Sequence, residues 1–278
     1  MQASIAFIGV GNMAGAIIRG LIQNGYPADL ITGTARGEEK RQAFTQELGI
    51  NMTDDNNAAV AEADVVVLCV KPAQMADVIA GFKSVISPDQ VYLSVAAGLG
   101  LESLSDWLGD VAIVRSMPNT PAQLGSGMTG LIANDKVTDA HKDWVTELFA
   151  SVGDSLWVED EKQMHTVTAL SGSAPAYFFR FLEAMIKSGQ TQGLDEASCR
   201  KLASYTMLGA ARMVTETSED ISQLRKNITS PNGTTEQALN SFEASDIDLI
   251  VDQAMQACIN RSNEMATLFA STTENKDS

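Results

Sequence analysis

Apolar residues in the first 160 positions alternate between short uninterrupted runs and stripes at helical spacing. The runs predict strands at residues 4–8, 30–34, 50–52, 65–70, 91–95, 111–114, 127–133 and 155–158. The stripes predict helices at residues 12–24, 38–48, 101–108 and 140–152, and one opened by Pro72. Residues 65–70 are apolar throughout, which is typical of a parallel strand covered on both faces. The alternation predicts an α/β fold with a parallel, doubly wound sheet.

After residue 158 the strand pattern stops and only helical spacing continues. Helices are predicted at residues 175–187, 195–215, 235–242 and 246–268, with Asp195 as a cap. We therefore expect two domains, 1–160 and 161–278, of which the second is all helical. This half is rich in apolar residues but has no sheet to pack on, so we expect at least a homodimer.

Composition narrows the classes of partner. The chain has 278 residues, enough for two cores, and a net charge of -16. That charge argues against nucleic acid and anionic membranes as partners, and no apolar run approaches the roughly 20 residues of a membrane helix. The three cysteines are dispersed and the chain enters a strand pattern directly, so we expect a cytoplasmic protein. The two histidines have no partner at metal-ligand spacing, so we expect no metal.

The first predicted strand runs into a glycine-rich turn and then a helix. Gly9 permits the tight bend, and Gly11 leaves room for a pyrophosphate beside the backbone. The helix that begins near Asn12 directs its N-terminus at the phosphates. This strand–turn–helix context predicts a dinucleotide site that includes Gly9, Gly11, Asn12 and Met13.

The end of the second predicted strand bears on the choice of cofactor. An NAD site would place a carboxylate there for the ribose hydroxyls, but residues 33–36 read GTAR. Arg36 could pair with a 2′-phosphate, although it could also be a solvated loop residue. We therefore expect NADP(H) as the preferred cofactor, with NAD(H) as an alternative.

Other turns follow strands at the same edge of the predicted sheet. The carboxyl ends of parallel strands border the ligand crevice, so we expect the residues that follow them to contact the cofactor. Taken singly, these turns could be purely structural. The further predicted cofactor-binding residues are Asn56, Val70, Lys71, Pro72, Ala96, Ala97, Asn119 and Pro121.

A polar turn at residues 228–235 (ITSPNGTT) separates two helical patterns. It contains no Lys, His, Asp or Glu, and its hydroxyls and backbone N–H groups lie at a helix N-terminus. Neutral donors and the positive end of a helix dipole can hold a small carboxylate. The predicted substrate-binding residues are Ser230, Gly233, Thr234, Thr235 and, from the small polar segment at the domain junction, Ser173.

Five segments together resemble the Δ1-pyrroline-5-carboxylate reductase family over nearly the whole chain. These segments are 9–14 (GVGNMA), 70–72 (VKP), 117–121 (MPNTP), 170–177 (LSGSAPAY) and 229–235 (TSPNGTT). The chain departs from the family pattern at Asn232 and Ala174, where glycine is usual, and at 219–220, where His-Pro is common. The resemblance implies a Rossmann-like domain, a helical dimerisation domain, active sites between subunits and assemblies up to decamers.

The resemblance also implies a reaction. Hydride would pass from NAD(P)H to the C=N carbon of 1-pyrroline-5-carboxylate and give L-proline, the last step of proline biosynthesis. The family pattern places Thr235 near the ring nitrogen as the catalytic residue. A threonine hydroxyl is too weak an acid to protonate that nitrogen outright, so we expect a polarising or proton-relaying role.

Two other functions remain open at this point. A β-hydroxyacid dehydrogenase would share the two-domain plan, but such enzymes resemble one another in a lysine followed four residues later by asparagine. Lys162, Lys187 and Lys226 are followed at that distance by Thr166, Thr191 and Ser230. A non-catalytic NADP(H)-sensing module is the second alternative, and it would have no need of a carboxylate-binding turn.

Overall fold

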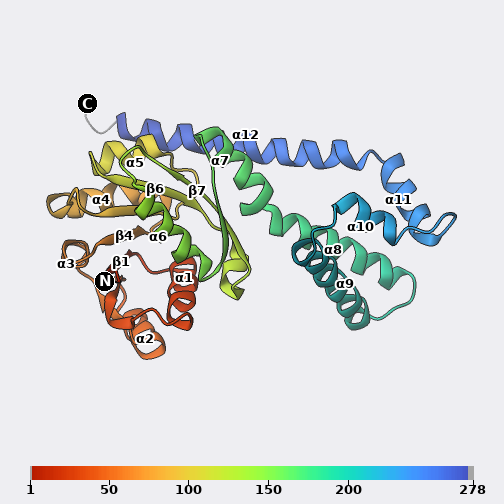
Figure 1. The fold of residues 1–278 in the computed structure, drawn as a ribbon, viewed down its shortest axis with the longest axis horizontal. Helices are drawn as coiled ribbons and strands as arrows, with labels where there is room; N and C mark the ends of the chain where they lie inside the picture. Colours follow the sequence, from red (N-terminus) through yellow and green to blue (C-terminus); the bar gives the residue numbers. More distant parts are fainter. Residues whose placement is uncertain (1, 275–278) are drawn as a thin grey trace. The chain divides into compact units, whose positions relative to one another are not determined.

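The computed structural model describes residues 2–274, which form two compact units (Figure 1). The first unit contains the chain up to Ser173 and the chain from Ala257 onward, and the second contains residues 174–256. The boundary between the two compact units therefore lies after Ser173. The functional division at residue 160 stays a prediction.

The first unit is built on one eight-stranded sheet in the order β3-β2-β1-β4-β5-β6-β7-β8. The strands are β1 (Ile5–Ile8), β2 (Ile31–Thr34), β3 (Asn51–Thr53), β4 (Val65–Leu68), β5 (Val91–Ser94), β6 (Ala112–Met117), β7 (Gly127–Ala133) and β8 (Gly153–Trp157). The first six strands are mutually parallel, which confirms the doubly wound arrangement. Strand β8 pairs parallel with β7, but the prediction of a parallel sheet is wrong where β7 joins β6, because these two strands run antiparallel. Their connection holds only a short 3-10 turn, η4 (Thr120–Leu124), and a parallel crossover needs a dozen or more residues.

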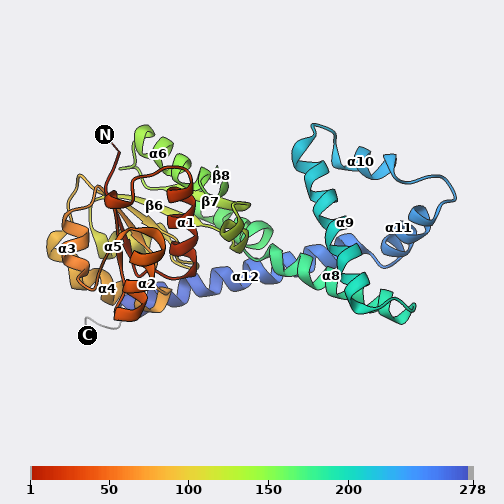
Figure 2. The ribbon, with the colours of Figure 1, turned by 90° about the horizontal axis from the view of Figure 1, so that it is seen from below.

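Helices cover both faces of the sheet (Figures 1 and 2). These helices are α1 (Asn12–Gln23), α2 (Glu38–Leu48), α3 (Asn56–Ala61), α4 (Met75–Phe82), α5 (Leu101–Leu108) and α6 (Asp139–Ala150). Strand β4 is apolar throughout because both of its faces are buried. Val65 and Val67 pack in the cluster beneath α1, α2 and α6, and Val66 and Leu68 pack in the cluster beneath α3, α4 and α5.

Short polar signals fix several helix starts. Thr138 caps α6, and His141 completes a capping box by accepting the Thr138 N–H at 3.3 Å. Helix α3 was not predicted from its short sequence, but Asp55 caps it by accepting the N–H groups of Asn57 and Ala58. The remaining 3-10 turns are η1 (Ala28–Leu30), η2 (Pro72–Gln74) and η3 (Lys83–Val85).

The rest of the chain is helical. It contains α7 (Glu161–Val167), the π-helical segment η5 (Thr168–Gly172), α8 (Ala174–Thr191), α9 (Glu196–Glu216), α10 (Ile221–Asn227), α11 (Thr234–Ala244) and α12 (Ile247–Glu274). Asp195 caps α9 as predicted, by accepting the Ser198 N–H at 3.0 Å. Helix α10 was not predicted. Within residues 2–274, no helix has both the length and the apolar character that a membrane crossing requires.

The second unit buries few of its own side chains. Of its residues, all of which the structure describes, only Ala174, Cys199, Ala203 and Leu224 are buried. Large apolar side chains on its helices are instead exposed, among them Phe178 (60%), Phe179 (57%), Leu202 (60%) and Tyr205 (70%). An apolar surface of this extent is typical of an interface between subunits.

Candidate functional site

A cleft of about 670 Å³ lies where the carboxyl ends of β1, β2 and β4 meet. The strand order reverses beside β1, which is where ligands bind in open α/β sheets. The segments that follow β1, β2, β3 and β4 all contribute to its lining. Its volume is typical of a small-molecule or cofactor site.

The glycine turn after β1 forms one wall of this cleft. Gly9 has a φ of +85°, and a Cβ there would lie 2.4 Å from Cγ1 of Val70. The Gly9 N–H donates to the Thr34 hydroxyl at 3.0 Å, which ties the turn to the end of β2. Gly11 both lines the cleft and caps α1, and a Cβ there would meet nothing within 4 Å. The N-terminus of α1 therefore opens onto space that a phosphate can occupy.

Six predicted cofactor-binding residues line the cleft: Gly9, Gly11, Arg36, Asn56, Val70 and Lys71. The other predicted residues are not part of its lining, and their cofactor contacts stay predictions; they are Asn12, Met13, Pro72, Ala96, Ala97, Asn119 and Pro121. The sequence did not identify Lys40 and Gln74 as lining residues. For Lys40 a signal was present, because it lies four residues after Arg36 across the start of α2.

The lining is rich in cations at the end of β2. Arg36 and Lys40 are exposed there, and Lys71 lies after β4. Thr34 stands at the end of β2, so no carboxylate ends that strand. Cys69 also lines the cleft, but burial raises the pKa of its thiol and keeps it neutral. Cations without an acid at this strand end favour a phosphorylated ribose.

Asn119 makes contacts that the sequence did not reveal. It is 8% exposed, its amide oxygen accepts the Met128 N–H at 3.0 Å, and its amide nitrogen donates to Ser171 at 3.3 Å. These bonds join the loop after β6 to β7 and to η5. A structural role for this side chain is therefore established.

The small residues of segment 170–176 have a packing reason. A Cβ on Gly172 would lie 2.5 Å from Cε of Met117, so η5 packs closely against the side chain at the end of β6, whose methyl group would have to move. Single π-helical turns of this kind are frequent at functional sites. Ser173 follows η5 and donates its N–H to Thr168. The hydroxyl oxygen of Ser173 accepts a hydrogen bond from the Cys258 thiol, at 3.4 Å.

The polar turn before α11 lies in the second unit, whereas Ser173 belongs to the first. Asn232 has a φ of 60°, so the left-handed backbone expected of a glycine at this position is present with asparagine. Gly233 caps α11 and donates its N–H to Ser230 at 2.9 Å. Thr234 and Thr235 begin the helix, and their N–H groups have no partner one turn earlier within it.

A charged residue next to this turn was missed. The Glu236 carboxylate accepts the Asn232 N–H at 2.8 Å. The turn is neutral within residues 228–235, as its sequence indicates, but its shape depends on this neighbouring carboxylate. A capping-box spacing, with the acid three residues after the helix cap, was the available signal.

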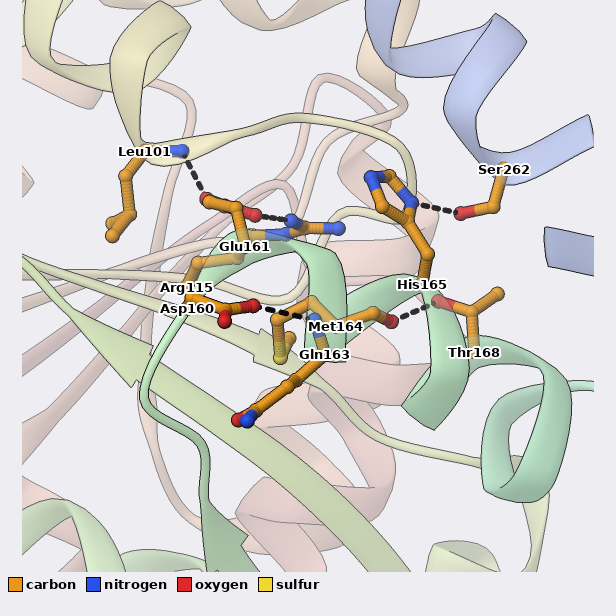
Figure 3. Close-up of polar contacts among 9 residues, drawn as sticks. All are labelled: Leu101, Arg115, Asp160, Glu161, Gln163, Met164, His165, Thr168 and Ser262. Atoms are coloured by element: carbon orange, nitrogen blue, oxygen red, sulfur yellow. Dashed lines mark hydrogen bonds and ion pairs between the residues drawn. The ribbon is translucent and has the colours of Figure 1, made fainter. Parts of the chain in front are cut away.

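A buried charged cluster is centred on Arg115 of β6 (Figure 3). Arg115 is 1% exposed and pairs with Glu161, whose second oxygen accepts the Leu101 N–H at 2.6 Å at the start of α5. Burial lowers the pKa of Arg115, and the Glu161 charge opposes that effect. On the same helix, the Nδ1 atom of His165 lies 2.8 Å from the Ser262 hydroxyl. Burial, followed by the charge of Arg115, lowers the pKa of His165.

No metal site is evident in the part of the chain that the structure describes. Within residues 2–274, no three His, Cys, Asp or Glu side chains come together in a metal-binding group. The expectation that the protein needs no metal stays a prediction.

Comparison with known proteins now defines the class. A family model described as NADP oxidoreductase coenzyme F420-dependent matches residues 4–98, and one described as pyrroline-5-carboxylate reductase dimerisation matches residues 161–265. With the Rossmann-like sheet and its cleft, these matches define a homo-oligomeric oxidoreductase that uses a nicotinamide cofactor.

Individual relatives give the family. A pyrroline-5-carboxylate reductase of Haemophilus influenzae is 47% identical over 95% of this chain and 98% of its own length, and one of Vibrio alginolyticus is 48% identical over the same shares. A solved pyrroline-5-carboxylate reductase of Coxiella burnetii superposes with a TM-score of 0.93 at 40% identity, covering 96% of this chain and 99% of its own. One of Plasmodium falciparum with NADP bound has a TM-score of 0.83 at 27% identity, covering 95% and 98%. The chain belongs to the pyrroline-5-carboxylate reductase family, which confirms the resemblance found in its sequence.

Proposed function

We propose that this enzyme reduces 1-pyrroline-5-carboxylate to L-proline with NADPH in preference to NADH, as the last step of proline biosynthesis. The assignment of this reaction rests on the match to pyrroline-5-carboxylate reductases at 47–48% identity, which covers nearly the whole of both chains. The preference for NADPH is supported by the cations Arg36 and Lys40 at an acid-free strand end.

The cleft fits a dinucleotide. The open space at Gly11 and the N-terminus of α1 suit a pyrophosphate, and Arg36 with Lys40 suits a 2′-phosphate. When bound, the reduced nicotinamide supplies the hydride. We assign Asn12, Met13, Asn56, Val70, Lys71, Pro72, Ala96, Ala97, Asn119 and Pro121 to the rest of the cofactor site, on the sequence argument above.

The substrate is assigned to the turn before α11 and to Ser173. The backbone N–H groups of Thr234 and Thr235, with the Ser230 hydroxyl, would bind the substrate carboxylate at a helix N-terminus. Gly233 leaves the approach to these donors free of a side chain. Thr235 would polarise the ring nitrogen or relay a proton to it, while solvent or a pre-protonated substrate supplies that proton. Positioning of two reactants accounts for much of the acceleration in such enzymes.

The helical half of the chain supports assembly into a homo-oligomer. We assign residues 1–160 to cofactor binding and residues 161–278 to dimerisation and substrate binding, with the active site shared between subunits. The dimerisation match over residues 161–265 and the exposed apolar helices of the second unit support a homodimer. Further assembly into a decamer and a cytoplasmic location belong to the same proposal; three dispersed free cysteines suit a reducing compartment.

Replacement of Thr235 tests the catalytic assignment. We expect Thr235→Ala to lower kcat by about tenfold or more, because one positioned donor to a reacting atom is removed. Thr235→Ser keeps the hydroxyl and should retain most of the turnover. NADPH binding, measured by nucleotide fluorescence, should be the same in all three proteins.

Thr191→Ala is a matched control, since that hydroxyl only donates to the Lys187 carbonyl at the end of α8. Unchanged turnover in Thr235→Ala would remove Thr235 from the mechanism. Equal losses in the alanine and serine variants would show that its hydroxyl is not the active group.

A further inference from the structure

We infer that Arg41 is a positioning residue that sets the preference of the cleft for a 2′-phosphate, an inference that rests on the proposed use of NADPH. Arg41 lies in the first turns of α2, directly after the loop that carries Arg36. Its Nη1 atom donates to the carbonyl oxygens of Ala35 at 2.8 Å and Arg36 at 2.9 Å. One guanidinium group therefore holds two consecutive peptide units of that loop.

The same guanidinium also neutralises a carboxylate of the cleft. Nη2 of Arg41 lies 3.2 Å from Oδ2 of Asp54, and Asp54 lines the cleft with 65% of its side chain exposed. An unpaired carboxylate at that position would repel a phosphate, whereas a neutral ribose hydroxyl would be little affected. Arg41 itself is only 20% exposed, so its guanidinium is committed to the loop and to Asp54.

The loop is held from its other side as well. The Ala35 N–H donates to the Thr53 carbonyl at 3.1 Å, next to Asp54. With the carbonyls of Ala35 and Arg36 bonded to Arg41, the side chains that this segment presents to the cleft include Arg36 and Lys40. A 2′-phosphate carries a charge of about -2, so the electrostatic part of this arrangement acts on NADPH and hardly on NADH.

The test measures cofactor binding without substrate, on the full chain in its native assembly. Dissociation constants for NADPH and NADH are obtained by nucleotide fluorescence, and those for 2′,5′-ADP and 5′-AMP by calorimetry. We expect Arg41→Met to weaken the binding of NADPH and of 2′,5′-ADP by about tenfold, and the binding of NADH and of 5′-AMP by no more than about twofold. Arg41→Lys keeps the charge without the planar fork and should give an intermediate loss.

Two further variants separate the contributions. Arg41→Met combined with Asp54→Asn removes the exposed carboxylate and should recover part of the lost NADPH affinity. Arg19→Met is the matched control, because Arg19 also holds α2, through Glu47 at 2.7 Å, but Glu47, unlike Asp54, does not line the cleft. It should leave all four dissociation constants unchanged.

Each contrary outcome identifies what fails. Equal weakening of NADPH and NADH in Arg41→Met would show a merely structural role and overturn the inference. A wild type that prefers NADPH and an Arg41→Met variant with the same preference would overturn the inference alone. A wild type that binds both nucleotides equally would overturn the proposed preference together with the inference.

Discussion

At the scale of single residues, the turn before α11 shows how a local backbone requirement is met. Asn232 adopts a φ of 60°, a conformation that costs most non-glycine residues about 1–2 kcal/mol and asparagine less. The Glu236 carboxylate holds its N–H, so the conformation is fixed from outside the turn. The position of the first N–H groups of α11 follows from this backbone conformation and this hydrogen bond.

Replacement of Asn232 tests this reasoning. We expect Asn232→Gly to retain stability and KM for 1-pyrroline-5-carboxylate, since glycine enters the left-handed region freely. Asn232→Val should lower the free energy of unfolding by about 1–2 kcal/mol and raise KM, because a β-branched residue resists that region. Urea unfolding and steady-state kinetics at one protein concentration measure both effects. Identical behaviour of the two variants would contradict a backbone role for Asn232.

At the scale of elements, buried polar links join helices to the sheet. Arg115 of β6 pairs with Glu161 of α7, which also accepts the first N–H of α5. His165 of α7 contacts Ser262 of α12. Glu161 thus links helices α5 and α7 to strand β6, and its carboxylate balances the charge of the buried Arg115 guanidinium (Figure 3).

Loss of that carboxylate should destabilise the first unit. We expect Glu161→Gln to lower the free energy of unfolding by about 2 kcal/mol, below the range for fully buried pairs because Glu161 is 36% exposed. The buried Arg115 would then lack its counter-charge. Glu159→Gln, two residues earlier and exposed, is the control and should shift stability by less than about 0.5 kcal/mol. Equal stability of the two variants would refute the link.

His165 gives this region a dependence on pH. Its pKa is lowered in the folded protein by burial and by Arg115, with Glu161 acting in the opposite direction, so the unfolded chain binds its proton more readily. Folding stability should therefore rise with pH, and the contribution of His165 should turn unfavourable as pH falls below about 6.5. We expect His165→Gln to gain stability relative to the wild type between pH 7.5 and about pH 5 in thermal unfolding. A constant difference between the two proteins over that range would exclude this titration.

The sequence predicted the elements whose side-chain period is regular. The six parallel strands and helices such as α2, α5 and α9 follow from apolar spacing and caps. Helices α3 and α10 are too short for a period to stand out, and the direction of β7 depends on the length of its connection to β6. At the site, Gly9, Gly11 and Arg36 could be predicted because a local motif defines them. Glu236 had a capping-box spacing as a local signal, but Arg41 and Arg115 could not be ranked above other charged residues, because their roles depend on the particular atoms that folding brings next to them.

At the scale of the whole molecule, the second unit requires a partner. Only four of its residues are buried, and its helices expose large apolar side chains. The dimerisation match covers this unit completely. Burial of these side chains between subunits would provide the core that the unit lacks.

Two leucines of equal exposure test this surface. Leu208 of α9 and Leu156 of β8 are both 53% exposed. We expect Leu208→Glu to weaken the dimer, since a charge would be buried at the subunit interface, and Leu156→Glu to leave it intact. Light scattering after size-exclusion chromatography measures the mass of each variant across protein concentrations. Dimers of equal stability in the two variants would place the interface elsewhere.

The central claim is that the enzyme transfers hydride from NADPH to 1-pyrroline-5-carboxylate. The most direct measurement incubates the purified protein with both compounds and follows the absorbance of the reduced nicotinamide together with the L-proline formed. We predict that one L-proline appears for each NADPH consumed. NADPH that binds but is not consumed, with no L-proline formed, would contradict the claim and leave a protein that only binds the nucleotide.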